Sequence, residues 1–105
     1  MAIGRIYVAH PDDSVGTLLG SGISVSESVP VADRGLEAGN IMATSDIPAG
    51  HKIALVSMKP GDRVIKYGFP IGLAVEAIER GEHVHVHNIE SERGRGDLAG
   101  QGTTQ

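Results

Sequence analysis

The sequence predicts a single compact all-β domain built from short strands and tight glycine turns. A chain of 105 residues is long enough for one domain but not for two. Its fifteen glycines and five prolines favour many turns and short strands over long helices. A seven-residue pattern with an apolar residue at each end and a central glycine recurs at residues 36–42, 47–53, 58–64 and 78–84. Each copy is typical of a tight turn that places glycine at a positive φ and leads into a strand.

The strands are expected to enclose an aliphatic core, because the chain has only three aromatic side chains. Residues 72–78 alternate in polarity, although one or two helical turns are an alternative for this segment. A turn is expected at Phe69-Pro70, and the strictly alternating residues 83–89 are predicted to form the last strand. In order, the predicted strands are 5–9, 15–19, 24–29, 53–56, 63–67, 72–78 and 83–89.

The hydrophobic pattern ends at residue 89, which predicts a domain over residues 1–89 and a flexible polar tail over 90–105. The tail is rich in glycine and has no apolar period, as is typical of segments that form no core.

Composition excludes several classes of function. Without cysteine the chain forms no disulfide and no thiolate metal site. The start lacks the apolar run of a signal peptide, and no stretch approaches the roughly 20 apolar residues of a membrane span. Net charge is −4 with lysine and arginine scattered, so neither nucleic acid nor a membrane is an expected partner. We expect a cytoplasmic protein, and composition leaves homo-oligomerisation open.

Three histidines alternate in the segment "GEHVHVHN", at positions 83, 85 and 87. On a strand they share one face, about 6.6 Å apart, while Val84 and Val86 face the core. A metal–nitrogen bond is only about 2.0–2.1 Å, so two neighbouring imidazoles can lean onto one ion, but three on a straight strand cannot. A metal site therefore needs further ligands from elsewhere, and exposed polar residues on an edge strand are the competing interpretation.

Other polar residues have equally simple explanations from the sequence. The segment from His10 to Asp13 ends a strand and fits a turn capped by an aspartate. His51 follows a turn glycine, where a solvated side chain is expected. Lys66 ends a strand, and near a site it would hold a carboxylate.

The segments "HPDDSVG", "DIPAGHKIAL", "VIKYGFPIG" and "GEHVHVHN" together resemble one family. They are similar to the SAF domain of altronate and galactarate dehydratases, which also occurs as a separate small subunit, as in sulfolactate sulfo-lyase. The resemblance covers residues 5–15 and 45–88 in the family's order, and "ESERGRGDL" is similar to the end of the separate small subunits. Residues 19–44 depart from it, being longer and richer in glycine than the family's short turn and strand.

The resemblance implies a β-clip fold and a role in dehydrating a sugar acid to a 2-keto-3-deoxy acid. It implies a partner, a large catalytic subunit, and a divalent metal cofactor, Fe²⁺ or Mn²⁺. Carried onto this sequence, it implies catalytic roles for His10, Lys66, His85 and His87, of which His85 and His87 would also bind the metal. Substrate contacts are implied for Asp13, His51, Tyr67 and Asn88. His83 matches the family least well of the three alternating histidines.

Dehydration of a 2,3-dihydroxy acid fits these residue types. A base removes the C2 proton, an acid protonates the leaving 3-hydroxyl, and charge stabilisation is required at the carboxylate. A domain of this size is expected to supply only half of such a site. Two alternatives stay open, namely the small subunit of a sulfolactate-type sulfo-lyase and a non-catalytic SAF module that binds a carbohydrate or a partner.

Overall fold

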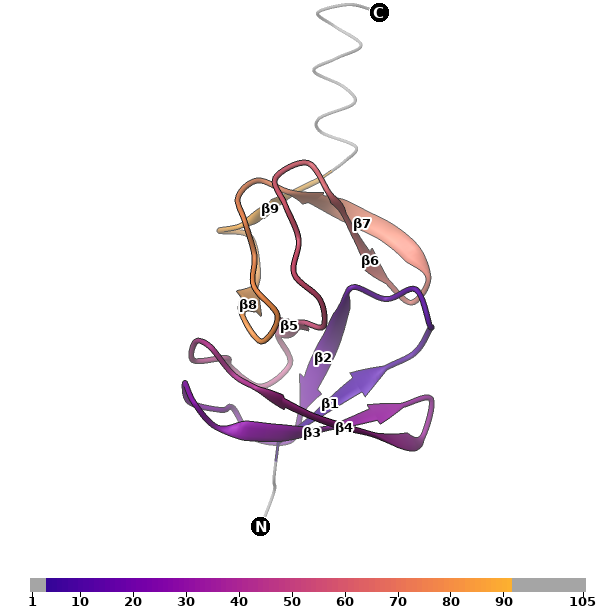
Figure 1. Ribbon diagram of the computed structural model, residues 1–105, viewed down its shortest axis with the longest axis vertical. Coiled ribbons are helices and arrows are strands. Elements are labelled where there is room, and N and C mark those ends of the chain that lie inside the picture. Colours follow the sequence, from indigo (N-terminus) through magenta and orange to yellow (C-terminus); the bar gives the residue numbers. More distant parts are fainter. Residues whose placement is uncertain (1–3, 92–105) are drawn as a thin grey trace, which may run out of the picture.

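The computed structural model describes residues 4–91, which form nine strands and no helix, so the all-β prediction is confirmed (Figure 1). Within this range no helix is long and apolar enough to span a bilayer. The strands are β1 (Arg5–Val8), β2 (Val15–Leu19), β3 (Ser28–Asp33), β4 (Leu36–Met42), β5 (Lys52–Ala54), β6 (Arg63–Lys66), β7 (Phe69–Ala74), β8 (His83–Val84) and β9 (Ile89–Glu90).

The strands form two sheets. Six strands pair in the order β4-β3-β1-β2-β5-β8, and three pair in the order β6-β7-β9. Only the β1–β3 pair is parallel, and every other named pair is antiparallel. Figure 1 shows β3 and β4 at one end of the domain and β6, β7 and β9 at the other, with β5 and β8 between them.

Four copies of one turn organise both sheets, at residues 23–29, 47–53, 58–64 and 78–84. The fourth residue of each copy has a positive φ, namely Ser26 (76°), Gly50 (85°), Gly61 (91°) and Gly81 (92°). Its backbone N–H donates to the carbonyl of a residue on a neighbouring segment, and the N–H of that neighbour donates back to the carbonyl of the fifth residue. The neighbours are Ala43, Leu18, Ala74 and Ala54, with distances of 2.7–2.9 Å. We call this pair of hydrogen bonds a turn lock.

An acidic side chain closes three of these turns. The carboxylates of Glu27, Asp62 and Glu82, each at the fifth position, accept a hydrogen bond from the backbone N–H three residues earlier. The copy at residues 47–53 differs, because Pro48 has no N–H to donate and His51 takes the place of the acid.

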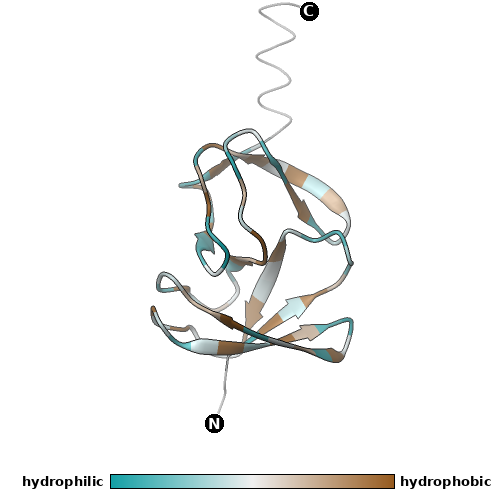
Figure 2. Cartoon of the chain, viewed as in Figure 1, coloured by the Kyte–Doolittle hydropathy of each residue, from teal (hydrophilic) through white to brown (hydrophobic). Residues whose placement is uncertain are grey.

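The turns also build the core. Their first apolar residues pair across the domain in two antiparallel bridges, Ile23 with Ile47 and Met58 with Ile78. Their first and last apolar residues are all buried, and they fall into two aliphatic clusters, one for each pair of turns. Elsewhere, apolar and polar residues are interspersed along the strands (Figure 2), which is the pattern of sheets with one covered face.

Two predictions within residues 19–44 are wrong. The glycine pattern at 36–42 forms no turn but strand β4, where Gly39 (φ 82°) lies at the irregularity opposite Pro30–Ala32 and Leu36 is 73% exposed. The predicted strand 24–29 begins as the first of the four turns, with Ser26 in the position that glycine holds elsewhere. This turn escaped prediction because serine rarely adopts a positive φ.

The hairpin of β6 and β7 also differs from the prediction. Its two-residue turn is Tyr67-Gly68, with φ values of 54° and 78°, and Phe69 and Pro70 already belong to β7. Strand β7 ends at Ala74, so the predicted strand at 72–78 stops early: Val75 lies in the connection to the fourth turn, and Ile78 is the first residue of that turn. Glu90, the first residue of the predicted tail, lies in β9, and residues 92–105 lie outside the described part of the chain.

Gly61 and Gly81 provide a matched test of the turn locks. Both have a φ near 90°, but a Cβ at Gly61 meets open space, whereas one at Gly81 collides with the carbonyl oxygen of Met42. We expect Gly61→Ala to lower the free energy of unfolding by about 1–2 kcal/mol through backbone strain alone. Gly81→Ala should cost about 1–3 kcal/mol more, measured by urea denaturation, because the chain must also move apart. Equal losses in the two variants would contradict the close packing at Gly81.

Candidate functional site

The alternating histidine segment is not one straight strand. Strand β8 stops at Val84, residues 85–88 turn, and β9 begins at Ile89, so the predicted strand over 83–89 is wrong. Val84 is buried as expected, but Val86, which was expected to face the core, is 79% exposed. The chain bends here because β8 pairs with β5 in one sheet while β9 pairs with β7 in the other.

Asn88 holds this bend. Its side chain is fully buried, accepts a hydrogen bond from the His85 N–H at 3.0 Å and donates one to the His83 carbonyl at 2.8 Å. Its own backbone N–H donates to the His85 carbonyl. The amide group is therefore engaged with the backbone of the turn it closes, which gives Asn88 a structural task. Its contact with a substrate stays a prediction.

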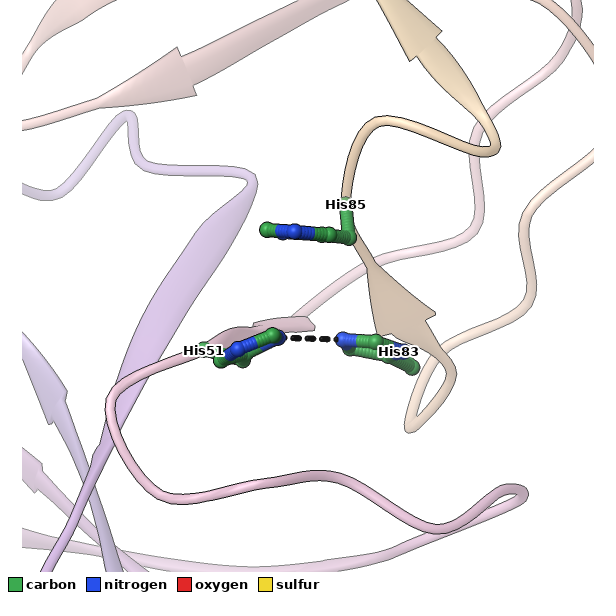
Figure 3. Close-up of side chains that lie close together, drawn as sticks. All are labelled: His51, His83 and His85. Carbon is green, nitrogen blue, oxygen red and sulfur yellow. Dashed lines mark hydrogen bonds between the residues drawn. The ribbon is translucent and has the colours of Figure 1, made fainter.

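The bend brings two of the alternating histidines to a third from another segment. His51, directly before β5, lies beside His83, and one ring donates an N–H to the other over 2.8 Å between His51 Nδ1 and His83 Nε2 (Figure 3). The His85 ring stacks on His51 with centroids 4.4 Å apart. One nitrogen from each of the three rings lies within 4.8 Å of the others. We call these three residues the histidine cluster.

His87 takes a different position from the one expected. It is exposed in the turn, and its ring contacts that of His83 with centroids 5.2 Å apart. The structure therefore groups His85 with His51 and His83, whereas the sequence paired it with His87. The rings of His83 and His85 also stack, with centroids 5.6 Å apart, so the alternating histidines stay near one another as predicted although the chain bends between them. What strand alternation could not predict is the contribution of His51.

The surroundings of His83 and His85 favour neutral imidazoles. Burial lowers the pKa of His83, and the neighbouring His51, His87, His85 and Lys52 lower that pKa further. The pKa of His85 is also lowered, first by desolvation and then by His51, Lys52 and His87. Neutral imidazoles keep a nitrogen lone pair, which is the form that accepts a proton or binds a metal.

Lys52 adds positive charge beside the histidine cluster, and Lys66 lies near Lys52. Burial lowers the pKa of Lys52, and the charge of Lys66 lowers it further, which places the two ammonium groups within electrostatic reach of each other. Lys66 Nζ lies 4.9 Å from the centroid of the Tyr67 ring. Lys52 was missed from the sequence, because a lysine in a short strand carries no signal of its own.

The segment from His10 to Asp13 has the capped-turn structure that the sequence allowed. The buried carboxylate of Asp13 accepts hydrogen bonds from the N–H groups of Ala9, His10 and Gly68 at 2.8–3.2 Å. It ties the β1–β2 connection to the Tyr67-Gly68 turn, and Ser14, exchanging hydrogen bonds with Ile65, strengthens the same tie. The substrate contact of Asp13 stays a prediction.

His10 lies apart from the histidine cluster. Its imidazole packs against Gly68, and its Nδ1 accepts a hydrogen bond from the Asp12 N–H. It lines a hollow of about 170 Å³ together with Asp13, Asp33 and Arg80, whereas the hollow beside His83 is lined by the first two turns.

Comparison with known proteins identifies the fold. Residues 5–92 match the altronate/galactarate dehydratase SAF domain. The chain is 54% identical over 52 residues to altronate dehydratase of Bacillus subtilis (strain 168), covering 50% of this chain and 10% of that protein. It is 39% identical over 62 residues to galactarate dehydratase (L-threo-forming) of Escherichia coli (strain K12), covering 54% of this chain and 12% of that enzyme.

A further relative matches from end to end. The chain is 37% identical over 92 residues to the (2R)-sulfolactate sulfo-lyase subunit alpha of Chromohalobacter salexigens, covering 83% of this chain and 95% of that subunit. The matched segments, about half of this chain, cover about a tenth of each dehydratase, whereas the match to the sulfo-lyase subunit covers nearly all of that subunit. With its match over residues 5–92, the chain belongs to the SAF-domain family of altronate and galactarate dehydratases, and it is a SAF domain of the kind associated with dehydratases and other lyases.

Proposed function

We propose that this chain is the small subunit of a lyase and completes the active site of a large catalytic subunit. The end-to-end match to a sulfo-lyase subunit alpha carries this proposal, since a homologous separate subunit of almost the same extent exists. The matches to two dehydratases, each covering about a tenth of the relative's length, support the same arrangement, in which the matched region is a small part of a larger enzyme. In those proteins the remaining nine-tenths lies outside the matched region.

The proposed substrate is a sugar acid of the altronate or galactarate type. Loss of the C2 proton and departure of the 3-hydroxyl as water yield an enol, which ketonises to a 2-keto-3-deoxy acid. The substrate is an anion, and negative charge grows at its carboxylate as the C2 proton leaves. Lys52 provides positive charge for that carboxylate beside the histidine cluster, and Lys66, near Lys52, adds to it.

The histidines serve proton transfer or ligation in this proposal. His85 combines a lowered pKa with partial exposure, so its neutral imidazole is available to a substrate held by the partner. His87 stands exposed next to it, and His10 and Tyr67 lie farther along the surface formed by the β6–β7 hairpin. The general base, the general acid and the residues that enclose the substrate are divided between this chain and the large subunit.

The proposal includes a divalent metal, Fe²⁺ or Mn²⁺. Such an ion would supply positive charge to the carboxylate and the 2-hydroxyl. Imidazole nitrogens suit Fe²⁺, whereas Mn²⁺ prefers carboxylate and water oxygens, so the donors of the histidine cluster favour Fe²⁺ of the two.

A second candidate is a sulfolactate-type sulfo-lyase. The observation that favours it is again the match to subunit alpha, which covers far more of this chain than either dehydratase does. Elimination would then release sulfite from C3 in place of water, and the enol would ketonise in the same way. The additional negative charge of a sulfonate also suits the two lysines.

Reconstitution tests the proposal. We expect the purified chain alone to be inactive, and turnover to appear when it is co-expressed with a large dehydratase or sulfo-lyase subunit from the same organism, in the presence of Fe²⁺ or Mn²⁺. Altronate, galactarate and sulfolactate should be assayed in parallel, with keto acid and sulfite as the products measured. Turnover by the small chain alone would refute the shared site, and inactivity of the complex on all three acids would refute the proposed reaction.

His85→Ala and His87→Ala should each lower kcat/KM of the assembled enzyme by about 10²-fold, the scale of losing a positioned proton-transfer group. Both side chains lie outside the two core clusters, so the free energy of unfolding should change by no more than about 0.5 kcal/mol. Denaturation of the isolated variants checks the second point. Wild-type turnover in both complexes would leave the histidines as exposed polar residues.

Lys52→Met should raise KM for the acid substrate by about 10-fold, because an anion loses one favourable charge interaction worth about 1.4 kcal/mol. Lys59→Met is the matched control, since Lys59 is an exposed lysine of the third turn. The ratio of the two KM values is the measurement. An equal KM in both variants would place the substrate carboxylate away from Lys52.

A further inference from the structure

We propose that this chain by itself binds one divalent transition-metal ion through His51, His83 and His85. The inference deepens the proposed function and rests on it for the role of the metal, although binding is tested without substrate or partner. The three donors come from two segments that β5 and β8 hold side by side, with Ile53 opposite His83. Figure 3 shows His51 and His83 edge to edge, joined by their hydrogen bond, with the His85 ring lying above them.

The spacing of the first two donors already matches a coordination shell. Two cis ligands with bonds of about 2.0–2.1 Å lie roughly 3.0 Å apart at a right angle and roughly 3.4 Å apart at a tetrahedral angle. His51 Nδ1 and His83 Nε2 are 2.8 Å apart, so only a small separation is needed. In the metal-free chain one of these nitrogens donates an N–H hydrogen bond to the other, and on metal binding that ring would carry its proton on its other nitrogen as a neutral imidazole.

The third donor requires a modest movement. The greatest separation among the three nitrogens is at most 4.8 Å, and closing it to a tetrahedral edge requires a shift of about 1–2 Å. The His85 side chain is partly exposed and follows the end of β8, so side-chain rotation provides this shift without moving the core. Asn88 fixes the backbone on which the rotation takes place.

An independent observation singles out His51. The other three turns carry an acid at this position, and each acid caps a backbone N–H. In this turn the residue three positions earlier is Pro48, which has no N–H to be capped. The His51 side chain therefore caps no backbone group, and it contacts His83 instead. Only in this copy is the fifth side chain free to act as a ligand.

The donor set indicates the class of metal. Three imidazoles without a carboxylate select borderline ions such as Fe²⁺, Co²⁺, Ni²⁺, Cu²⁺ or Zn²⁺ over Mg²⁺ and Ca²⁺. Three protein ligands leave coordination positions open, as in catalytic rather than structural sites. Lys52 beside the histidine cluster favours an anion, such as a substrate carboxylate, in an open position.

Titration of the untagged full-length chain with Co²⁺, followed by visible absorption, tests the site. We expect one Co²⁺ per chain, displaced by Zn²⁺, and no competition from Mg²⁺. His51→Ala, His83→Ala and His85→Ala should each weaken the affinity by at least about 10-fold, the minimum expected for losing a direct ligand. His51→Gln, which keeps a hydrogen-bonding side chain but is a poor ligand, should do the same if His51→Ala fails to fold.

His10→Ala and His87→Ala are the matched controls, because each removes an exposed or partly exposed imidazole outside the histidine cluster. Both should keep the wild-type affinity within about 2-fold. Unchanged affinity in His51→Gln, or a loss in His87→Ala as large as in His83→Ala, would overturn the ligand set. If the isolated chain binds Co²⁺ but the reconstituted complex shows no turnover, the proposed reaction is refuted and the metal site stands. If the complex turns over substrate but the isolated chain binds no Co²⁺, the metal site is refuted and the proposed reaction stands.

Discussion

The turn lock is the interaction on which the rest of the domain depends. Each of the four turns holds a residue of a neighbouring segment by two backbone hydrogen bonds, and each requires a positive φ at its fourth position. With two small aliphatic clusters in place of one large core, these locks join segments that the side chains alone join weakly. The lock of Gly81 onto Ala54 sets β8 against β5, and the histidine cluster exists because of that pairing.

The candidate site arises where the regular pattern is broken. One break is in the second turn, where Pro48 removes the N–H that an acid would cap and His51 becomes available. The other is the buried Asn88, whose amide bends the chain after Val84 and turns His85 back toward His51. Neither residue has to contact a ligand. Pro48 leaves the His51 imidazole without a capping role, and Asn88 positions the imidazole of His85. In this way one copy of the repeated turn comes to carry the candidate site.

The composition of the site agrees with a role shared between chains. Within residues 4–91 the histidine cluster lies beside Lys52, the pKa values of His83 and His85 are lowered, and the cluster contains no carboxylate. In the function proposed above, these nitrogen donors and this positive charge would complement an acid substrate, and a large subunit would supply the remaining proton-transfer groups and the walls of the pocket. The family comparisons agree, since the domain occurs both inside large dehydratases and as a separate lyase subunit.

The sequence by itself determined the all-β class, most strand positions and three of the four turns, because glycine spacing and apolar periodicity are local properties. It also identified the candidate polar residues and, by resemblance, the family. Tertiary structure decided the turn at Ser26, the bend at Asn88 and the meeting of His51 with His83. The alternation of polar and apolar residues does not show where a strand ends. Here the two ends of the alternating segment, β8 and β9, pair with different sheets, and the chain bends between them. Contacts between residues 32 positions apart depend on that pairing, so the histidine cluster became visible only once the chain was folded.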